Sequence, residues 1–253
     1  MNQLIRKVPQ VALLFWIIKL LTTAMGESTS DFLVFHFNPY AAVILGFIVF
    51  VAVMCLQLKT SRYIPWVYWL AVLMVAIFGT MAADVTHVAL GVPYIVSTIV
   101  FAIALAMVFY LWQKSEGTLS IHSITTPRRE LFYWATVLAT FALGTAAGDL
   151  FAFTLKLGFL SAGIVFAVIF AVPAIGRWLF RWNSIFSFWF AYILTRPLGA
   201  SFADWTGKEH GVGGLGWGDG PVAAVLFIMI VILVGYLQMT HEDVDTSPSH
   251  PKA

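Results

Sequence analysis

Charged residues are scarce in this chain. Only 10% of its 253 residues are Asp, Glu, Lys or Arg, whereas soluble domains carry about 25%. Apolar residues make up 60% of the chain, and its mean hydropathy is +0.90. A soluble fold cannot keep this much apolar surface away from water. The composition therefore excludes a soluble catalytic domain and indicates a protein embedded in the lipid bilayer.

Cysteine is nearly absent as well, because Cys55 is the only one. A single cysteine excludes an intramolecular disulfide and a cysteine-rich metal site. The net charge is only +2, and no basic cluster could bind phosphates, so we expect no nucleic-acid partner. The chain lacks the fingerprints of zinc proteases, P-loop enzymes and serine hydrolases, and we expect no enzymatic activity.

Long apolar runs bounded by Pro, Gly, Asn and charged residues predict the helices. About 20 apolar residues cross a bilayer once, so the chain has room for about eight spans. The predicted spans cover residues 9–35, 40–58, 64–88, 93–113, 129–155, 158–176, 183–205 and 221–239. We expect an all-α membrane protein with a single transmembrane domain over 1–240 and a disordered cytoplasmic tail over 241–253.

The same pattern of residues occurs four times along the chain. An aromatic residue and Trp are followed after nine residues by Gly and after four more by Asp, once in each odd-numbered span. The repeats cover approximately residues 8–60, 61–115, 126–180 and 181–240. Each repeat contains two spans, so all four enter the membrane in the same orientation. We therefore expect four parallel tandem helical hairpins around an axis along the membrane normal.

The pattern defines three sets of equivalent residues. The tryptophans are expected to pack between helices or to anchor them at the membrane interface: Trp16, Trp69, Trp134 and Trp189. The glycines are expected to permit close packing of the repeats: Gly26, Gly79, Gly144 and Gly199. The aspartates are expected to lie at similar depth in the outer part of the membrane: Asp31, Asp84, Asp149 and Asp204.

These tandem two-helix units and their tryptophans resemble a bacterial membrane-protein family, the repeat of unknown function called DUF347. The resemblance extends from Val8 to Leu237, nearly the whole chain. It implies four two-helix units, each with a characteristic tryptophan. It implies no activity, so the function must be argued from the residues themselves.

An aspartate inside a bilayer costs roughly 2.5–3.5 kcal/mol, so the four aspartates are expected to face the interior of the bundle. One helical turn earlier, three of the repeats carry a second oxygen ligand on the same helix face: Glu27, Thr80 and Thr145. The spans contain two bases, Lys19 and Arg196, which are expected to balance part of the charge. Protons or a bound cation would offset the remainder.

Oxygen ligands suit hard divalent cations, and a nearby histidine favours Mn²⁺ or another transition metal. The expected metal ligands are Asp31, Asp84, His87, Asp149 and Asp204. The sequence thus predicts a proton-coupled transporter of a divalent cation, with Mn²⁺ as the first candidate. We expect no cofactor besides this cation, which is bound as substrate.

Basic residues in the loops indicate the orientation. Apart from Lys156 and Lys208, all loop Lys and Arg residues lie at the termini or after the second, fourth and sixth spans. By the positive-inside rule, both termini face the cytoplasm. We expect a multi-pass protein of the bacterial inner membrane whose partners are the lipid bilayer and a small ion.

Two other functions fit the same residues. In a structural or interaction protein, the aspartates would only hold the repeats together by hydrogen bonds. In a membrane-embedded aspartyl hydrolase, Asp204 would act with Asp219, because Gly216-Trp217-Gly218-Asp219 matches the Gly-x-Gly-Asp motif of intramembrane aspartyl proteases. Otherwise the glycine-rich stretch 211–220 is expected to be a flexible external loop or a gate.

Overall fold

A computed structural model describes residues 6–243 of the chain, apart from the side chains of 88 and 89. Its eight α-helices are α1 (Leu13–His36), α2 (Pro39–Lys59), α3 (Pro65–Asp84), α4 (Tyr94–Glu116), α5 (Pro127–Asp149), α6 (Gly158–Phe180), α7 (Ser184–Gly207) and α8 (Asp219–Thr240). Two π-helical turns, η1 (Val85–Ala89) and η3 (Leu150–Thr154), directly continue α3 and α5. Short 3-10 turns, η2 (Ile121–Ser123) and η4 (His210–Val212), lie in loops. No strand occurs among the residues described, so the all-α prediction is confirmed.

Helix starts follow from local sequence. Proline occupies the first turn of α2, α3 and α5, where its missing N–H costs no hydrogen bond. The side chain of Asn38 caps α2 by accepting a hydrogen bond from the backbone N–H of Ala41, at 3.1 Å. Asn183 caps α7 in the same way. These signals place the hairpin boundaries close to the predicted ones.

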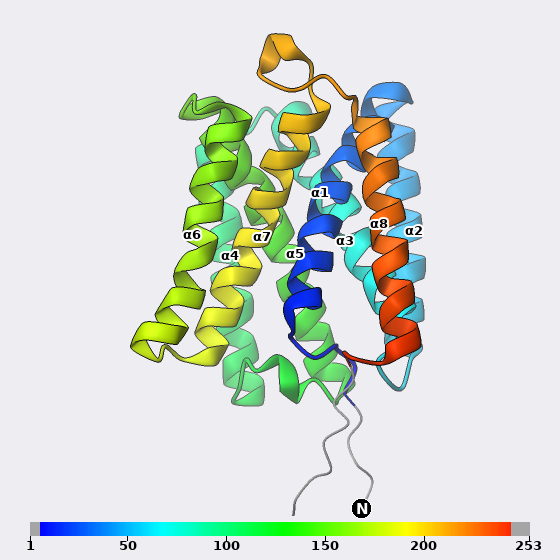
Figure 1. The fold of residues 1–253 in the computed structure, drawn as a ribbon, viewed down its shortest axis with the longest axis vertical. Coiled ribbons are helices and arrows are strands. Elements are labelled where there is room, and N and C mark those ends of the chain that lie inside the picture. The colour runs from blue at the N-terminus through cyan, green and yellow to red at the C-terminus, as the bar shows by residue number, and fades with distance from the viewer. Residues whose placement is uncertain (1–5, 244–253) are drawn as a thin grey trace, which may run out of the picture.

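The odd-numbered helices form a closed inner ring. Helix α1 packs against α3, α3 against α5, α5 against α7, and α7 against α1. Each even-numbered helix packs mainly against the first helix of the following repeat: α2 on α3, α4 on α5, α6 on α7, and α8 back on α1. Figure 1 shows α4 and α6 on one side and α2 and α8 on the other, with the odd-numbered helices between them.

This arrangement separates a buried ring from a lipid-facing shell. In the most apolar part of α3, 72% of the residues are buried inside the protein, against 17% in α4. Within the described residues, six helices are long and apolar enough to cross a membrane: α2, α3 with η1, α4, α5 with η3, α6 and α8. Helices α1 and α7 are 24 residues long but more polar, because they carry buried charged residues of the ring. The chain is therefore a multi-pass α-helical membrane protein.

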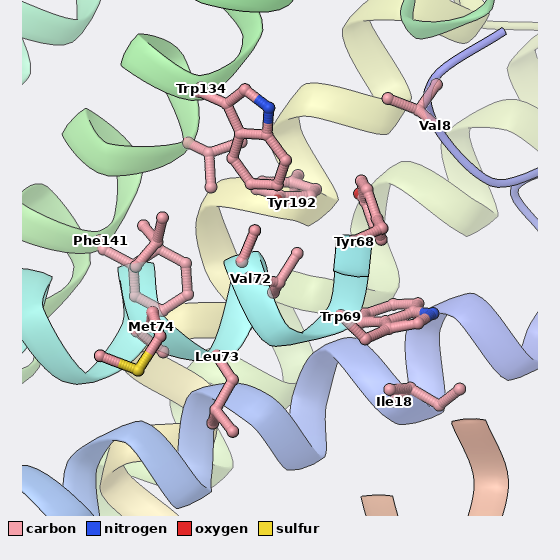
Figure 2. Close-up of a cluster of buried hydrophobic side chains, with 14 of the residues drawn as sticks. Val8, Ile18, Tyr68, Trp69, Val72, Leu73, Met74, Trp134, Phe141 and Tyr192 are labelled. Atoms are coloured by element: carbon pink, nitrogen blue, oxygen red, sulfur yellow. The ribbon is translucent and has the colours of Figure 1, made fainter. Parts of the chain in front are cut away.

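Aromatic side chains fill the interior of the four inner helices near the end of the bundle at which the termini lie. The rings of Phe15 and Phe188 are 6.1 Å apart, and the hydroxyls of Tyr68 and Tyr133 share a hydrogen bond. These four residues are the aromatic partners of the repeat tryptophans. Figure 2 shows Tyr68 near other rings of this layer. Three tryptophans of the repeat pattern are buried here, and the fourth, Trp16, is partly exposed.

The start of the predicted disordered tail belongs to the folded part. Asp243 is buried, and its backbone carbonyl accepts a hydrogen bond from the N–H of Gln10, at 2.8 Å. The hydroxyl of Tyr63 donates a hydrogen bond to its carboxylate. These contacts connect the segment before α1 with the segment after α8, at the end of the bundle where both termini lie. The rest of the predicted tail, residues 244–253, lies outside the described residues.

The glycines of the repeat pattern lie where inner helices approach closely. A Cβ atom on Gly26 of α1 would lie 2.5 Å from the Cβ of Ala76 in α3, and 2.9 Å from its backbone carbonyl carbon. An added Cβ would also come within 3.0 Å of a neighbouring side chain at the other three glycines: Gly79, Gly144 and Gly199. These positions have no room for a larger residue unless a helix moves.

Replacing Gly26 with alanine is expected to destabilise the protein by about 1–3 kcal/mol, because the Ala76 backbone cannot yield as a flexible side chain would. The matched control is Gly235→Ala in α8, where the nearest atom to an added Cβ is 3.7 Å away. That control is expected to be neutral or stabilising, since alanine favours helix more than glycine. Denaturant unfolding in detergent micelles measures both. Equal stabilities of the two variants would contradict the close crossing.

Candidate functional site

Charged side chains occupy the ring interior beyond the aromatic layer. Helix α1 contributes Lys19, Glu27 and Asp31, and α7 contributes Arg196 and Asp204. These residues recur at intervals of four or eight, so each helix presents them on one face. Neighbouring helices α1 and α7 therefore bring their charges together in the ring.

Arg196 is the centre of the inner part of this site, with a side chain that is only 1% exposed. Its guanidinium forms an ion pair with Glu27 of α1 and donates hydrogen bonds to Thr80 of α3, at 2.6 Å, and to Thr145 of α5, at 2.8 and 3.1 Å. It also donates to the backbone carbonyl of Thr23, at 3.4 Å. One side chain of α7 thus binds all three other inner helices.

The two threonines predicted as ion ligands are engaged by this guanidinium. The hydroxyl of Thr80 donates to the carbonyl of Ala76, at 2.8 Å, and that of Thr145 to the carbonyl of Phe141, at 3.0 Å. Each hydroxyl oxygen then accepts from Arg196. Both hydroxyls thus have partners within the protein, and the threonines position the arginine.

Closer to the outer end of the ring, acids gather around Lys208, the residue after α7. Its ammonium forms an ion pair with Asp31, and lies 3.2 Å from the carboxylate of Asp219 and 4.0 Å from that of Asp204. Burial alone lowers the pKa of the Lys208 amine, but the carboxylates of Asp31 and Asp204 outweigh burial and hold the pKa above its ordinary value. Lys208 is therefore a firmly charged member of the site.

Sequence reasoning missed this role, because Lys208 was assigned to an external loop. Its spacing of four from Asp204 is a signal that could have identified it. The ion pair with Asp31 has no such signal, because it depends on α1 and α7 lying side by side.

Three carboxylates could hold a cation. Glu27, Asp31 and Asp204 each offer an oxygen, and these oxygens lie within 4.8 Å of one another. Oxygens from several carboxylates are what Ca²⁺, Mg²⁺ and Mn²⁺ prefer. Glu27 is also paired with Arg196, and Asp31 with Lys208, so a cation here would compete with both bases.

The remaining repeat aspartates, Asp84 and Asp149, have a different setting. Their charges interact with each other and with those of Glu27 and Asp31, so all four belong to one electrostatic cluster. Within the described part of the chain, however, neither Asp84 nor Asp149 forms an ion pair. Each is followed directly by a π-helical turn, a feature frequent at functional sites. The four aspartates thus divide into a pair beside Lys208 and a pair with no adjacent base.

Two predicted site residues have other partners. The Nδ1 of His87 lies 3.0 Å from the carbonyl of Val92, and its ring packs 4.3 Å from that of Tyr94, so the start of α4 holds it without a contact to an aspartate. The amine of Lys19 lies 4.1 Å from the centre of the Phe141 ring and 4.4 Å from that of Tyr192. It has no hydrogen-bond partner among the described residues. Lys19 is therefore stabilised by aromatic faces and not by an acid.

The glycine-rich loop after α7 is an ordered structure that covers the end of this helix. The N–H groups of residues 215–218 donate to the carbonyls of residues 205–208, at 2.7–3.1 Å. A Cβ on Gly214 would lie 2.0 Å from the carbonyl oxygen of Lys208, so only glycine allows this approach. The loop therefore forms a hydrogen-bonded cap around the backbone of Lys208.

The hairpins observed in the structure match a known repeat. A profile described as Repeat of Unknown Function (DUF347) matches residues 14–63, 67–118, 132–181 and 187–243. The chain belongs to this family. Each matched segment contains one inner helix and the outer helix that follows it, so the DUF347 repeat is the helical hairpin itself. No curated protein and no solved structure matches the chain.

In this DUF347 protein, replacing Arg196 with methionine is expected to lower the free energy of unfolding by about 3–5 kcal/mol, because Glu27 is left buried without its partner. Removing both charges, in Arg196→Met with Glu27→Gln, is expected to recover part of the loss. Denaturant unfolding in micelles measures all variants. Exposed Arg62 provides the control, since Arg62→Met is expected to change stability by less than about 0.5 kcal/mol. A double variant less stable than Arg196→Met would contradict the pairing.

Proposed function

We propose that this protein transports a cation across the membrane in which it is embedded. The observation that carries the proposal is the group of carboxylates from Glu27, Asp31 and Asp204, whose oxygens lie within 4.8 Å of one another inside a ring of membrane helices. Ionisable residues at such positions are costly and mark ion or proton pathways.

The balance of charge favours a divalent cation with proton coupling. The site contains six acids: Glu27, Asp31, Asp84, Asp149, Asp204 and Asp219. It contains three bases: Lys19, Arg196 and Lys208. If all ionise, three negative charges remain, and a divalent ion with bound protons would offset them.

The donor set narrows the choice of ion. The three candidate ligand atoms that lie within 4.8 Å of one another are all carboxylate oxygens, which suit Mg²⁺, Ca²⁺ and Mn²⁺. His87, whose nitrogen favoured a transition metal, contacts Val92 before α4 and Tyr94 at its start. The proposed substrate class is therefore a hard divalent cation, and Mn²⁺, the first candidate from the sequence, serves as the practical probe for this class.

Access is proposed from the outer end of the ring. The side chains of Asp31 and Lys208 are 13% and 20% exposed there, whereas Arg196 and the aromatic layer fill the ring between the carboxylates and the end with the termini. Basic loops at the end with the termini favour a cytoplasmic location for that end. In this proposal the protein lies in a bacterial inner membrane, and the aspartates open towards the opposite side.

One alternative has support of its own. The ion pairs of Asp31 with Lys208 and of Glu27 with Arg196 connect different helices, as a purely structural role would require. The hydrolase alternative is less consistent with the geometry. The Lys208 ammonium lies 4.0 Å from the carboxylate of Asp204 and 3.2 Å from that of Asp219, so a base stands beside both acids, whereas aspartyl proteases need two carboxyls that share one proton.

Transport can be measured with purified protein in liposomes that contain a Mn²⁺-sensitive dye. Wild-type protein is expected to admit Mn²⁺, and the double variant Asp84→Asn with Asp149→Asn is expected to lose at least about tenfold in rate, since it removes the two acids without an ion-pair partner. The matched control is Glu209→Gln, which removes an exposed acid at the same end of the molecule and is expected to keep the wild-type rate.

Folding of each variant is checked by its monodispersity and unfolding midpoint. A double variant that stays folded and transports at the wild-type rate would contradict the proposal. A double variant that fails to fold would favour the structural role of the aspartates. The absence of flux for Mg²⁺, Ca²⁺ and Mn²⁺ in wild-type liposomes would refute the proposed substrate class.

A further inference from the structure

We propose that the ammonium of Lys208 is a tethered cation that occupies the entrance of the transported ion's site, and that this side chain must swing out before the ion can bind. The inference rests on the proposed function and adds a regulatory element to it. It starts from the fact that Lys208 and an incoming cation need the same carboxylate oxygens.

The overlap between the two sets of ligands is direct. Asp31 and Asp204 are two of the three carboxylates that could hold a metal ion. The same two, with Asp219, surround the Lys208 ammonium. A metal ion within about 2.6 Å of these oxygens would lie too close to the ammonium for both charges to stay. Lysine and ion are therefore alternatives at this position.

Only the side chain of Lys208 has freedom to move. Its backbone N–H donates to the carbonyl of Asp204, at 2.9 Å, and its own carbonyl accepts from Gly216, at 2.8 Å. Gly214 packs directly against that carbonyl. The glycine-rich cap thus holds the backbone, while the four-carbon side chain ends at the partly exposed rim. The exposed ring of Phe35 lies 5.3 Å from the ammonium and can receive it as the side chain moves.

The Lys208 ammonium can compensate the carboxylates when the transporter has no bound ion. After a bound cation leaves, Asp31 and Asp204 would face each other with uncompensated charge in a poorly solvated site. The Lys208 ammonium would restore the balance without an external ion. A cation must also outcompete it, which favours a divalent ion over a monovalent one.

The first experiment compares Mn²⁺ binding to full-length wild-type protein and to Lys208→Gln by isothermal titration calorimetry in nanodiscs. The variant is expected to bind Mn²⁺ at least about tenfold more tightly, because the competitor is gone. Lys156→Gln is the control, since it removes the other external base, which is exposed in the loop between α5 and α6. Its affinity is expected to equal that of the wild type.

A second experiment follows Lys208 in the unaltered protein and so does not depend on the folding of a variant. An amine-reactive acetylating reagent is applied with and without MnCl₂, and modification of Lys208 and Lys156 is quantified by mass spectrometry. Mn²⁺ is expected to accelerate modification of Lys208 at least about fivefold and to leave Lys156 unchanged. Choline chloride of equal ionic strength controls for screening of the ion pairs.

The outcomes separate the two proposals. If wild type binds Mn²⁺ but Lys208→Gln binds equally or more weakly, or if Mn²⁺ does not accelerate Lys208 modification, the tethered-cation inference is overturned while the transport proposal stands. If Mn²⁺ binds to neither wild type nor Lys208→Gln, the proposed function fails and the inference fails with it.

Discussion

Charge inside a membrane must be compensated by another part of the protein, by protons or by ions, and this requirement organises the molecule. Apart from Lys208, which follows α7, and Asp219, which begins α8, the acids and bases of the site lie on the inner helices, and the apolar outer helices pack around these. Each outer helix packs on the first helix of the next repeat, so the shell surrounds the ring on all sides. The ring is thus a polar interior built from a very apolar sequence.

The bases that compensate the acidic charge are distributed unequally among the repeats, although the repeats share one sequence pattern. Arg196 lies seven residues after its repeat tryptophan, and the corresponding residues of the other repeats are Thr23, Ala76 and Phe141. A guanidinium has five N–H donors, enough for one arginine to bind acceptors on all the neighbouring inner helices. Four arginines at these positions would repel one another in a shared interior. The fourth repeat therefore provides a single central arginine, which four identical repeats could not.

The same asymmetry divides the aspartates. Lys208 follows the fourth inner helix and reaches the aspartates of the first and fourth repeats, which are neighbours because the ring closes between α7 and α1. Asp84 and Asp149, on the adjacent helices α3 and α5, have no equivalent lysine. The fourfold sequence pattern therefore forms a site with two unlike halves: one lies beside the Lys208 ammonium, and the other has no ion pair among the described residues.

The repeats, the helices and the interior position of the acids could be predicted from the sequence, because periodic apolar runs and exact spacing determine them. Contacts that depend on how the ring closes, such as that of Asp31 with Lys208, could not be predicted. The π-helical turns after Asp84 and Asp149 could not be predicted either, since an apolar run indicates only one uninterrupted helix. Lys19 was expected to meet an acid, but the aromatic faces of Phe141 and Tyr192 lie closer to its amine.

Proton release on ion binding tests the central claim most directly, because an acidic cluster that exchanges protons for a cation must liberate them. Calorimetric titration of the wild-type protein with Mn²⁺ in two buffers of different ionisation enthalpy counts the protons released per ion. The account predicts saturable binding that liberates at least one proton per Mn²⁺ near neutral pH. Binding with no proton release would contradict the proposed proton coupling, and no binding at all would show that the carboxylates are compensated within the protein and serve its structure alone.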